Sequence, residues 1–238
     1  MTTNAKEHLC VALDGSDRPW ILSAARSLAD HAGWLKIGLE AFTAHGPQLV
    51  EEVADTGARV FLDLKLHDIP ATVHRAATNC AACGAQMLTV HASGGHTMLE
   101  AAVEGAHEGA PHAPPQVVAV TVLTSLDQMD LDDLGVKLQA HDLVASWARL
   151  ARSANLDGVV ASPREAALIR RECGEKFLIV TPGIRPESSD NDDQRRVLTP
   201  SEAITAGADI LVVGRPITRA ADPVEAARRI LGEIAAAI

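Results

Sequence analysis

The chain has 238 residues, of which 47% are hydrophobic and 22% are charged, as in an ordinary soluble globular protein. Its formal net charge of −10 argues against a nucleic-acid-binding surface, which is normally basic. No apolar run approaches the roughly 18 residues of a membrane span, and no signal peptide is recognisable, so we expect a protein of the reducing cytoplasm.

Short β-rich apolar segments alternate with longer amphipathic ones along the whole chain. We predict strands at 9–13, 35–38, 59–65, 87–91, 117–123, 158–161, 177–180 and 209–213. Helices are predicted at 20–31, 47–55, 72–83, from Gly95 to about 104, around 143–151 after a polar segment at 124–138, and at 164–172 and 223–234. This alternation implies a parallel sheet. Eight such units without a linker favour one closed (β/α)8 TIM barrel, a single domain over residues 1–238, rather than an open sheet.

The predicted strand 59–65 carries charge where a buried strand should be apolar. Asp63 and Lys65 are two residues apart, so a regular strand places them on the same face. Asp68 and Pro70 follow where the strand should become a loop. Charges inside an α/β protein must be paired, so this segment is the first candidate for a functional site.

Polar residues also mark the ends of the other predicted strands. In TIM barrels the chemistry lies at the C-terminal ends of the strands. The residues at those ends are Asp14, Lys36, Asp63, Lys65, His91, Thr124, Ser125, Pro182, Gly214 and Arg215.

Lys36 and Lys65 lie in otherwise apolar strands, and Asp63 and Asp68 bracket Lys65. Burial lowers the pKa of a lysine, whereas neighbouring carboxylates raise it. The pattern favours a protonated, rigidly held lysine that stabilises a developing carbanion and then protonates it. A purely structural ion-pair network remains the alternative.

Three other chemistries are less favoured by the same residues. A Schiff-base lysine needs a depressed pKa, which two flanking carboxylates oppose. Ser125 and His91 could belong to a hydrolytic triad, but nothing in the sequence sets up the relay. Asp63, Asp68 and His91 could bind a divalent metal, but the nearby lysines would repel the ion.

The end of the last predicted strand indicates an anion site. Gly214 allows backbone N–H groups to approach an anion, and Arg215 adds a forked cation, in a region where barrels often bind phosphate. Arg185 and Gln194 lie in a long polar loop after the seventh strand, a candidate lid. The alternatives are a plain left-handed turn at Gly214 with a solvated Arg215, and a merely flexible surface loop.

The four cysteines include a Cys80-x-x-Cys83 pair in an Ala-rich stretch that looks helical. No second pair of cysteines or histidines completes a zinc site. We therefore expect buried free thiols rather than a metal or redox site.

Taken together, these motifs resemble the orotidine 5′-phosphate decarboxylase family over essentially the whole chain. The core of the resemblance is Asp63-x-Lys65-x-x-Asp68-Ile69-Pro70, although Asp-x-Lys-x-x-Asp alone marks only a wider superfamily. Ala71 is one departure, because bacterial members often carry Asn there. The supporting segments are Leu13-Asp14, Lys36-Ile37-Gly38, Val90-His91 with Gly94-Gly95, Thr124-Ser125, 181–186, 192–196 and Val213-Gly214-Arg215.

The resemblance implies decarboxylation of orotidine 5′-phosphate to UMP at C6 of the pyrimidine, without metal or cofactor. Lys65 would stabilise the C6 carbanion and protonate it, and Asp63 would lie near the substrate carboxylate. Lys36 and Asp14 would hold the ribose hydroxyls.

The resemblance also implies the remaining contacts. Thr124 and Ser125 would address the pyrimidine, and Pro182 would line the substrate site. The 5′-phosphate would be held by Arg185, Gln194, Gly214 and Arg215. A homodimer would share each site across its interface, with Asp68 and Thr72 supplied by the partner chain.

Two alternatives remain open. A metal-dependent sugar-phosphate decarboxylase, aldolase or epimerase of the same superfamily would typically place an acidic residue where this chain has Lys36. A nucleotide-binding barrel that has lost its chemistry would not need to keep Lys65 and both aspartates.

Overall fold

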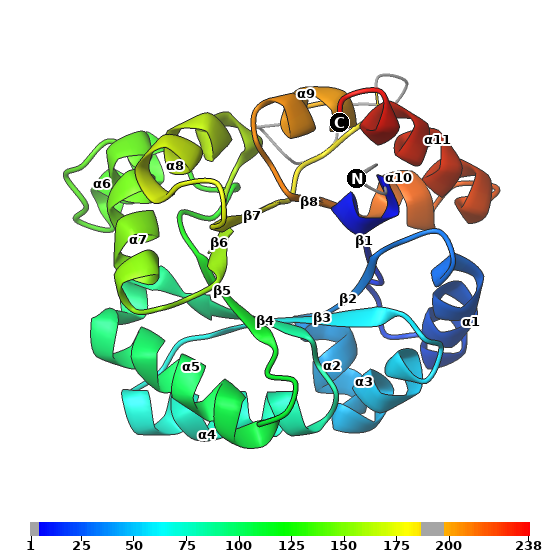
Figure 1. The fold of residues 1–238 in the computed structure, drawn as a ribbon, viewed down its shortest axis with the longest axis horizontal. Coiled ribbons are helices and arrows are strands. Elements are labelled where there is room, and N and C mark those ends of the chain that lie inside the picture. Colours follow the sequence, from blue (N-terminus) through cyan, green and yellow to red (C-terminus); the bar gives the residue numbers. More distant parts are fainter. Residues whose placement is uncertain (1–4, 187–197) are drawn as a thin grey trace.

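The computed structural model describes residues 5–186 and 198–238, and in them eight parallel strands close into a barrel. The strands are β1 (Leu9–Ala12), β2 (Trp34–Gly38), β3 (Arg59–Leu66), β4 (Met87–His91), β5 (Gln116–Val120), β6 (Gly158–Val160), β7 (Leu178–Thr181) and β8 (Ile210–Val213). Each strand pairs with its neighbours in the sequence, and β8 pairs with β1 to close the ring. Helices surround the barrel (Figure 1), so the predicted (β/α)8 TIM barrel is confirmed.

The helices follow the predicted rhythm, with additions between the strands. The α-helices are α1 (Arg18–Leu28), α2 (Leu39–His45), α3 (Pro47–Ala54), α4 (Pro70–Ala82), α5 (His96–Gly109), α6 (Gln128–Asp133), α7 (Ala140–Ser153), α8 (Ala166–Cys173), α9 (Pro200–Thr205), α10 (Arg215–Thr218) and α11 (Pro223–Ala235). Short 3₁₀ helices are η1 (Ala5–His8), η2 (Ala92–Gly94) and η3 (Pro163–Glu165). The short helices α2, α6, α9 and α10 were not predicted.

Local hydrogen bonds explain where the prediction fails. In the polar segment 124–138, Asp127 and Asp130 form a capping box that starts α6. The strand predicted at 117–123 ends at Val120, and the N–H and the hydroxyl of the next residue, Thr121, both donate to the carbonyl of Val160. Helix α4 begins at Pro70 rather than at Thr72, since proline fits the first helical position.

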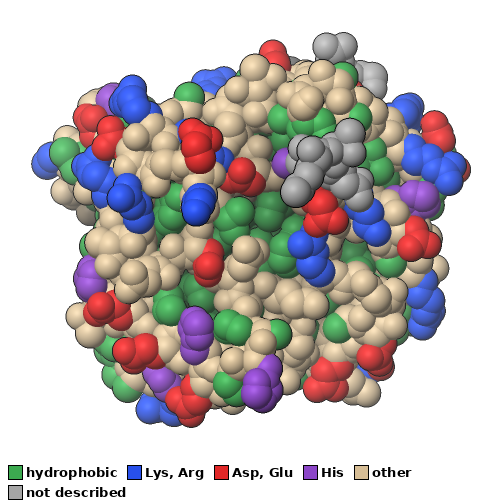
Figure 2. Space-filling model, viewed as in Figure 1, with side chains coloured by type: hydrophobic (Ala, Val, Ile, Leu, Met, Phe, Trp, Pro, Cys, Tyr) green, Lys and Arg blue, Asp and Glu red, His purple; other side chains and the backbone are tan. Residues whose placement is uncertain are grey.

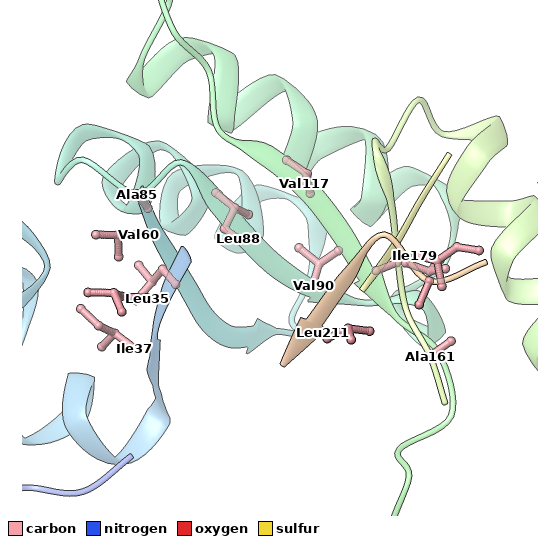
Figure 3. Close-up of a cluster of buried hydrophobic side chains, with 14 of the residues drawn as sticks. Leu35, Ile37, Val60, Ala85, Leu88, Val90, Val117, Ala161, Ile179 and Leu211 are labelled. Atoms are coloured by element: carbon pink, nitrogen blue, oxygen red, sulfur yellow. The ribbon is translucent and has the colours of Figure 1, made fainter. Parts of the chain in front are cut away.

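The hydrophobic core has two layers, on the two faces of the sheet. The outer layer packs between strands and helices, and Figure 3 shows part of it, including Val60, Leu88 and Val90. The inner layer fills the barrel and consists of Cys10, Trp34, Phe61, Met87, Val118, Val180 and Ile210. Because side chains alternate along a strand, Lys36 lies on the same face as Trp34, and Asp63 on the same face as Phe61. The charged residues are thus the next layer above an apolar barrel floor.

Side chains also join the strands at their N-terminal ends. The residue just before β4, β6 or β8 accepts a hydrogen bond from the second backbone N–H of the preceding strand. These pairs are Val60 N–H to Gln86, Val117 N–H to Asp157, and Ile179 N–H to Asp209. Arg170 adds further bonds there, donating to the Asp209 carboxylate and to three carbonyls of the loop before β7. This end of the barrel is therefore built for stability.

The surface matches the composition. Figure 2 shows acidic and basic side chains intermixed over the outer ring of helices, with hydrophobic side chains towards the centre of the barrel. Within the described ranges, no helix is both long and apolar enough to span a membrane.

Helices α4 and α5 approach each other closely through two glycines. A Cβ atom at Gly105 would overlap the carbonyl oxygen of His74, and one at Gly109 would overlap that of Thr78. These neighbours are backbone atoms, so they cannot rotate aside.

We expect Gly105→Ala to lower the free energy of unfolding by about 1–3 kcal/mol, because the helices must separate to admit the methyl group. Gly232→Ala in α11 is the control, since apart from its chain neighbours and its own helix backbone no described atom lies within 4 Å of the added Cβ. That control should gain about 0.5–1 kcal/mol from higher helix propensity. Urea denaturation measures both, and equal stability of the two variants would contradict the close packing.

Candidate active site

A cavity of about 290 Å³ opens at the C-terminal ends of the strands. It brings together nine of the residues singled out from the sequence: Asp14, Lys36, Asp63, Lys65, Thr124, Pro182, Arg185, Gly214 and Arg215. These residues come from six different strand ends or the loops that follow them. The cavity therefore lies at the end of the barrel where TIM barrels usually carry their active sites.

Four charged side chains form an alternating chain along the cavity wall. Lys36 Nζ lies 3.0 Å from Asp14 Oδ1 and 3.5 Å from Asp63 Oδ2. Lys65 Nζ lies 2.8 Å from Asp63 Oδ1. The side chains of Lys36 and Asp63 are only 10% and 13% exposed, so the two central charges are desolvated and held by each other.

Burial and neighbouring charges act in opposite directions on this pair. Burial alone would raise the pKa of Asp63, but Lys36 and Lys65, together with hydrogen bonds, outweigh it and hold the pKa below its usual value. Burial alone would lower the pKa of Lys36, but Asp63 and Asp14 outweigh it and raise that pKa. Both groups are therefore charged at neutral pH.

The backbone at Lys65 departs from a regular strand. Lys65 has a positive φ of 54°, and the pairing of β3 with β4 shifts register between Leu62 and Leu66. The expectation of a regular alternation through Asp63 and Lys65 is wrong at this point, although the two side chains do meet. The Thr89 hydroxyl accepts a hydrogen bond from the backbone N–H of Lys65 at 2.8 Å and donates to Asp63 Oδ1 at 3.0 Å.

Glycine makes room for the ion pair between Lys36 and Asp14. A Cβ atom at Gly38 would lie 3.1 Å from Lys36 Nζ and 3.2 Å from Asp14 Oδ1. A larger residue would push these two side chains apart. The Lys36-Ile37-Gly38 motif thus has a steric reason in addition to a chemical one.

The cavity lining also includes two arginines, Arg185 and Arg215. Ile184 forms a β-bridge with Leu198, and the Arg185 N–H donates to the Leu198 carbonyl at 3.0 Å, which ties the loop's two ends together. Gly214 has a φ of −107°, so the alternative of a left-handed turn there is wrong. Gln194, like the rest of 187–197, lies outside the described residues.

Four of the residues singled out from the sequence do not line the cavity of this chain. Asp68 and Ser125 are exposed, and Thr72 lies in the first turn of α4. The Asp68 carboxylate accepts a hydrogen bond from the Ile69 N–H at 2.6 Å. His91 stacks at a tilt on His67, with ring centroids 5.4 Å apart, and burial, His67 and Lys65 lower its pKa.

Several lining residues could not be found from the sequence. They are the apolar residues Ala12, Phe61, Val120, Val122, Leu123, Val160, Ala161 and Val212. In sequence they cannot be told from ordinary core residues. Thr89 does not line the cavity but contacts Lys65 and Asp63, and it was also missed, because threonine is common in strands.

The four cysteines are buried free thiols, as predicted. Burial raises the pKa of Cys80 to about 12, which keeps this thiol protonated and unreactive. In the described part of the chain, no group of three or more His, Cys, Asp or Glu side chains is arranged to hold a metal ion.

Comparison with known proteins agrees with this geometry. The sequence model of the "Orotidine 5'-phosphate decarboxylase / HUMPS family" matches residues 7–230. The chain belongs to this family. It is 52% identical to the orotidine 5′-phosphate decarboxylase of Moorella thermoacetica, over 97% of this chain and 93% of the relative. It is 46% identical to that of Syntrophomonas wolfei, over 97% and 98%.

A solved structure gives the same result. The orotidine 5′-phosphate decarboxylase from Lactobacillus acidophilus superposes with a TM-score of 0.84 at 36% identity, covering 95% of this chain and 98% of that one. The family resemblance drawn from the motifs is confirmed.

The lowered pKa of Asp63 predicts how stability depends on pH. Its stabilising contribution is present above the usual carboxyl pKa of 3.8 and is lost as pH falls through the lower folded-state value. Below pH 4 the free energy of unfolding of Asp63→Asn should therefore fall less steeply than that of wild type, by up to about 1.4 kcal/mol per pH unit. Urea titrations at several pH values measure the slope. Asp30→Asn, at an exposed site, should keep the wild-type slope, and a wild-type slope in Asp63→Asn would contradict the prediction.

Proposed function

We propose that this protein decarboxylates orotidine 5′-phosphate to UMP in pyrimidine biosynthesis, with Lys65 as the proton donor and no metal or cofactor. Family membership and near-full-length relatives of this name support the reaction. The observation that carries the mechanism is the alternating Asp14–Lys36–Asp63–Lys65 chain on the cavity wall.

In the proposed reaction the bond between C6 and the carboxylate breaks, CO₂ leaves, and the electron pair stays on C6. The Lys65 ammonium stabilises this carbanion and then gives it a proton, which solvent later returns to the lysine. Asp63 faces the departing carboxylate and holds the ammonium in place through its Oδ1. Because the ion pairs exist before substrate binds, little reorganisation is needed during the reaction.

The other cavity residues bind the rest of the substrate in this proposal. Lys36 and Asp14 hold the ribose hydroxyls, and Thr124, with Ser125 and Pro182, addresses the pyrimidine. Arg185, Gly214 and Arg215, with Gln194 from the loop 187–197, hold the 5′-phosphate. Binding energy from this remote phosphate can be used at the transition state.

The proposal includes a homodimer in which the partner chain supplies Asp68 and Thr72. The exposed position of Asp68 supports it, since this carboxylate does not reach the cavity of its own chain. Ile69, next to it, is 67% exposed, and such an apolar side chain is well suited to an interface. Three expectations remain predictions from the sequence: that the protein binds no nucleic acid, that it binds no membrane, and that it is cytoplasmic.

The metal-dependent sugar-phosphate enzyme is the main alternative, and chelation separates it from the proposal. The decrease in absorbance of orotidine 5′-phosphate is followed after exhaustive EDTA treatment. Undiminished turnover is expected. If turnover were lost after EDTA treatment and restored by a divalent metal, the metal-free mechanism would be wrong.

We expect Lys65→Ala to lower kcat by at least about 10²–10⁴-fold, because the proton donor is lost, while UMP still binds. Steady-state kinetics and calorimetric titration with UMP measure the two effects. Lys176→Ala, an exposed lysine in the loop before β7, should retain wild-type kcat. Near-normal turnover by Lys65→Ala would contradict the proton-donor role.

The shared site predicts complementation between two inactive variants. When Lys65→Ala and Asp68→Ala are mixed and allowed to exchange subunits, half of the dimers are hybrids with one intact site each. About a quarter of the wild-type activity should then return. Activity assays before and after exchange measure this. No recovery, with exchange verified by mass spectrometry, would place Asp68 and Lys65 in the same subunit's site or show that Asp68 is not needed.

A further inference from the structure

Strand β3 contains more residues than its neighbour can pair with. It advances from Leu62 to Leu66 while β4 advances only from Leu88 to Val90. The extra residues include Asp63 and Lys65, so their backbone groups cannot all bond the β4 backbone. The β4 residue opposite this bulge is Thr89, which is fully buried. The Lys65 N–H has no backbone acceptor on β4 at this point, and the Thr89 hydroxyl accepts its hydrogen bond instead.

The backbone conformation of Lys65 is one that a lysine rarely adopts. Its φ of 54° lies in the left-handed region, which generally costs a non-glycine residue about 1–3 kcal/mol. Such a conformation persists only where surrounding contacts enforce it. The contact made by the Lys65 N–H is the one with Thr89.

The two neighbours of the Thr89 hydroxyl determine which hydrogen bond it accepts and which it donates. The Lys65 N–H is a donor, so Thr89 Oγ1 accepts from it. The single hydroxyl proton is then free to be donated to Asp63 Oδ1, at 3.0 Å. Lys65 Nζ binds the same Asp63 oxygen at 2.8 Å. The main chain and the side chain of Lys65 are thus both tied to one carboxylate oxygen, the former through Thr89.

We propose that Thr89 is a positioning residue: its hydroxyl holds the Lys65 backbone in the left-handed conformation and so aims the ammonium at the reacting carbon. The proposal rests on the proposed function, because the value of aiming the lysine lies in proton delivery. Thr89 does not line the cavity, so it acts through Lys65 and Asp63 and not on the substrate. A misplacement of about 1 Å at a reacting group can cost on the order of 10²-fold in rate.

The test compares Thr89→Val, which keeps the shape of the side chain and removes the hydroxyl, with Thr89→Ser, which keeps the hydroxyl. Thr181→Val is the matched control. Thr181 is equally buried in β7, and its Oγ1 has no hydrogen-bond partner among the described residues. Val180 belongs to the inner layer, so Thr181 faces the opposite side of the sheet, away from the barrel interior.

We expect kcat of Thr89→Val for orotidine 5′-phosphate to fall by about 10–100-fold, with KM within about twofold because the phosphate site is remote. Thr89→Ser should recover most of kcat, and Thr181→Val should keep all of it. A purely structural role would lower the stability of Thr89→Val and Thr181→Val without separating their kcat values. Equal kcat in these two variants would overturn the proposal.

A crystal structure of Thr89→Val provides a readout that does not depend on the substrate. Lys65 should leave the positive-φ region, and the contact of 2.8 Å between its Nζ and Asp63 should lengthen. If wild type does not turn over orotidine 5′-phosphate, the proposed function fails, and this structure still tests the role of Thr89. An unchanged Lys65 conformation in Thr89→Val would overturn the positioning role whatever the substrate is.

Discussion

The site depends on a single carboxylate, that of Asp63. Its Oδ1 accepts hydrogen bonds from Lys65 and Thr89, and its Oδ2 faces Lys36. A buried carboxylate without such partners would take up a proton, and a buried lysine without it would lose one. Each charged group therefore keeps its neighbour ionised, and removal of one group leaves a buried charge without a partner. The alternating chain should behave as a unit, so single substitutions in it will not add.

The barrel separates this chemistry from the bonds that hold the fold together. At the N-terminal ends, Gln86, Asp157 and Asp209 each join two neighbouring strands. The equivalent position before β2 is Gly33, which has no side chain to make such a bond and joins β1 only through its backbone N–H, to the Leu9 carbonyl. The inner apolar layer lies between these side-chain hydrogen bonds and the charged layer. A buried charge network is a poor source of stability, so its presence at the other end points to function.

Sequence reasoning reached the fold and most of the cavity because both follow from periodicity. Alternating strands and helices predict the barrel, and inward-facing Lys36 and Asp63 follow from the two-residue repeat. The bulge at Lys65 could not be predicted, because it depends on how β3 and β4 pair. Thr89 is a common strand residue, so only this mismatch gives its hydroxyl a role. Asp68 and Thr72 do not line the cavity of their own chain, so their proposed place in a site depends on a second chain, which the periodicity of one sequence does not describe.

The charged residues that line the cavity fall into two groups, the balanced ion pairs and two arginines. Asp14 and Asp63 balance the charges of Lys36 and Lys65, so these four side chains carry no net charge. Arg185 and Arg215 give the described lining a net positive charge, in a chain whose net charge is −10. A locally positive pocket on an acidic protein raises the local concentration of an anionic ligand. In the proposed mechanism the arginines therefore supply attraction and the balanced pairs supply a rigid proton donor, so binding and proton transfer depend on different residues.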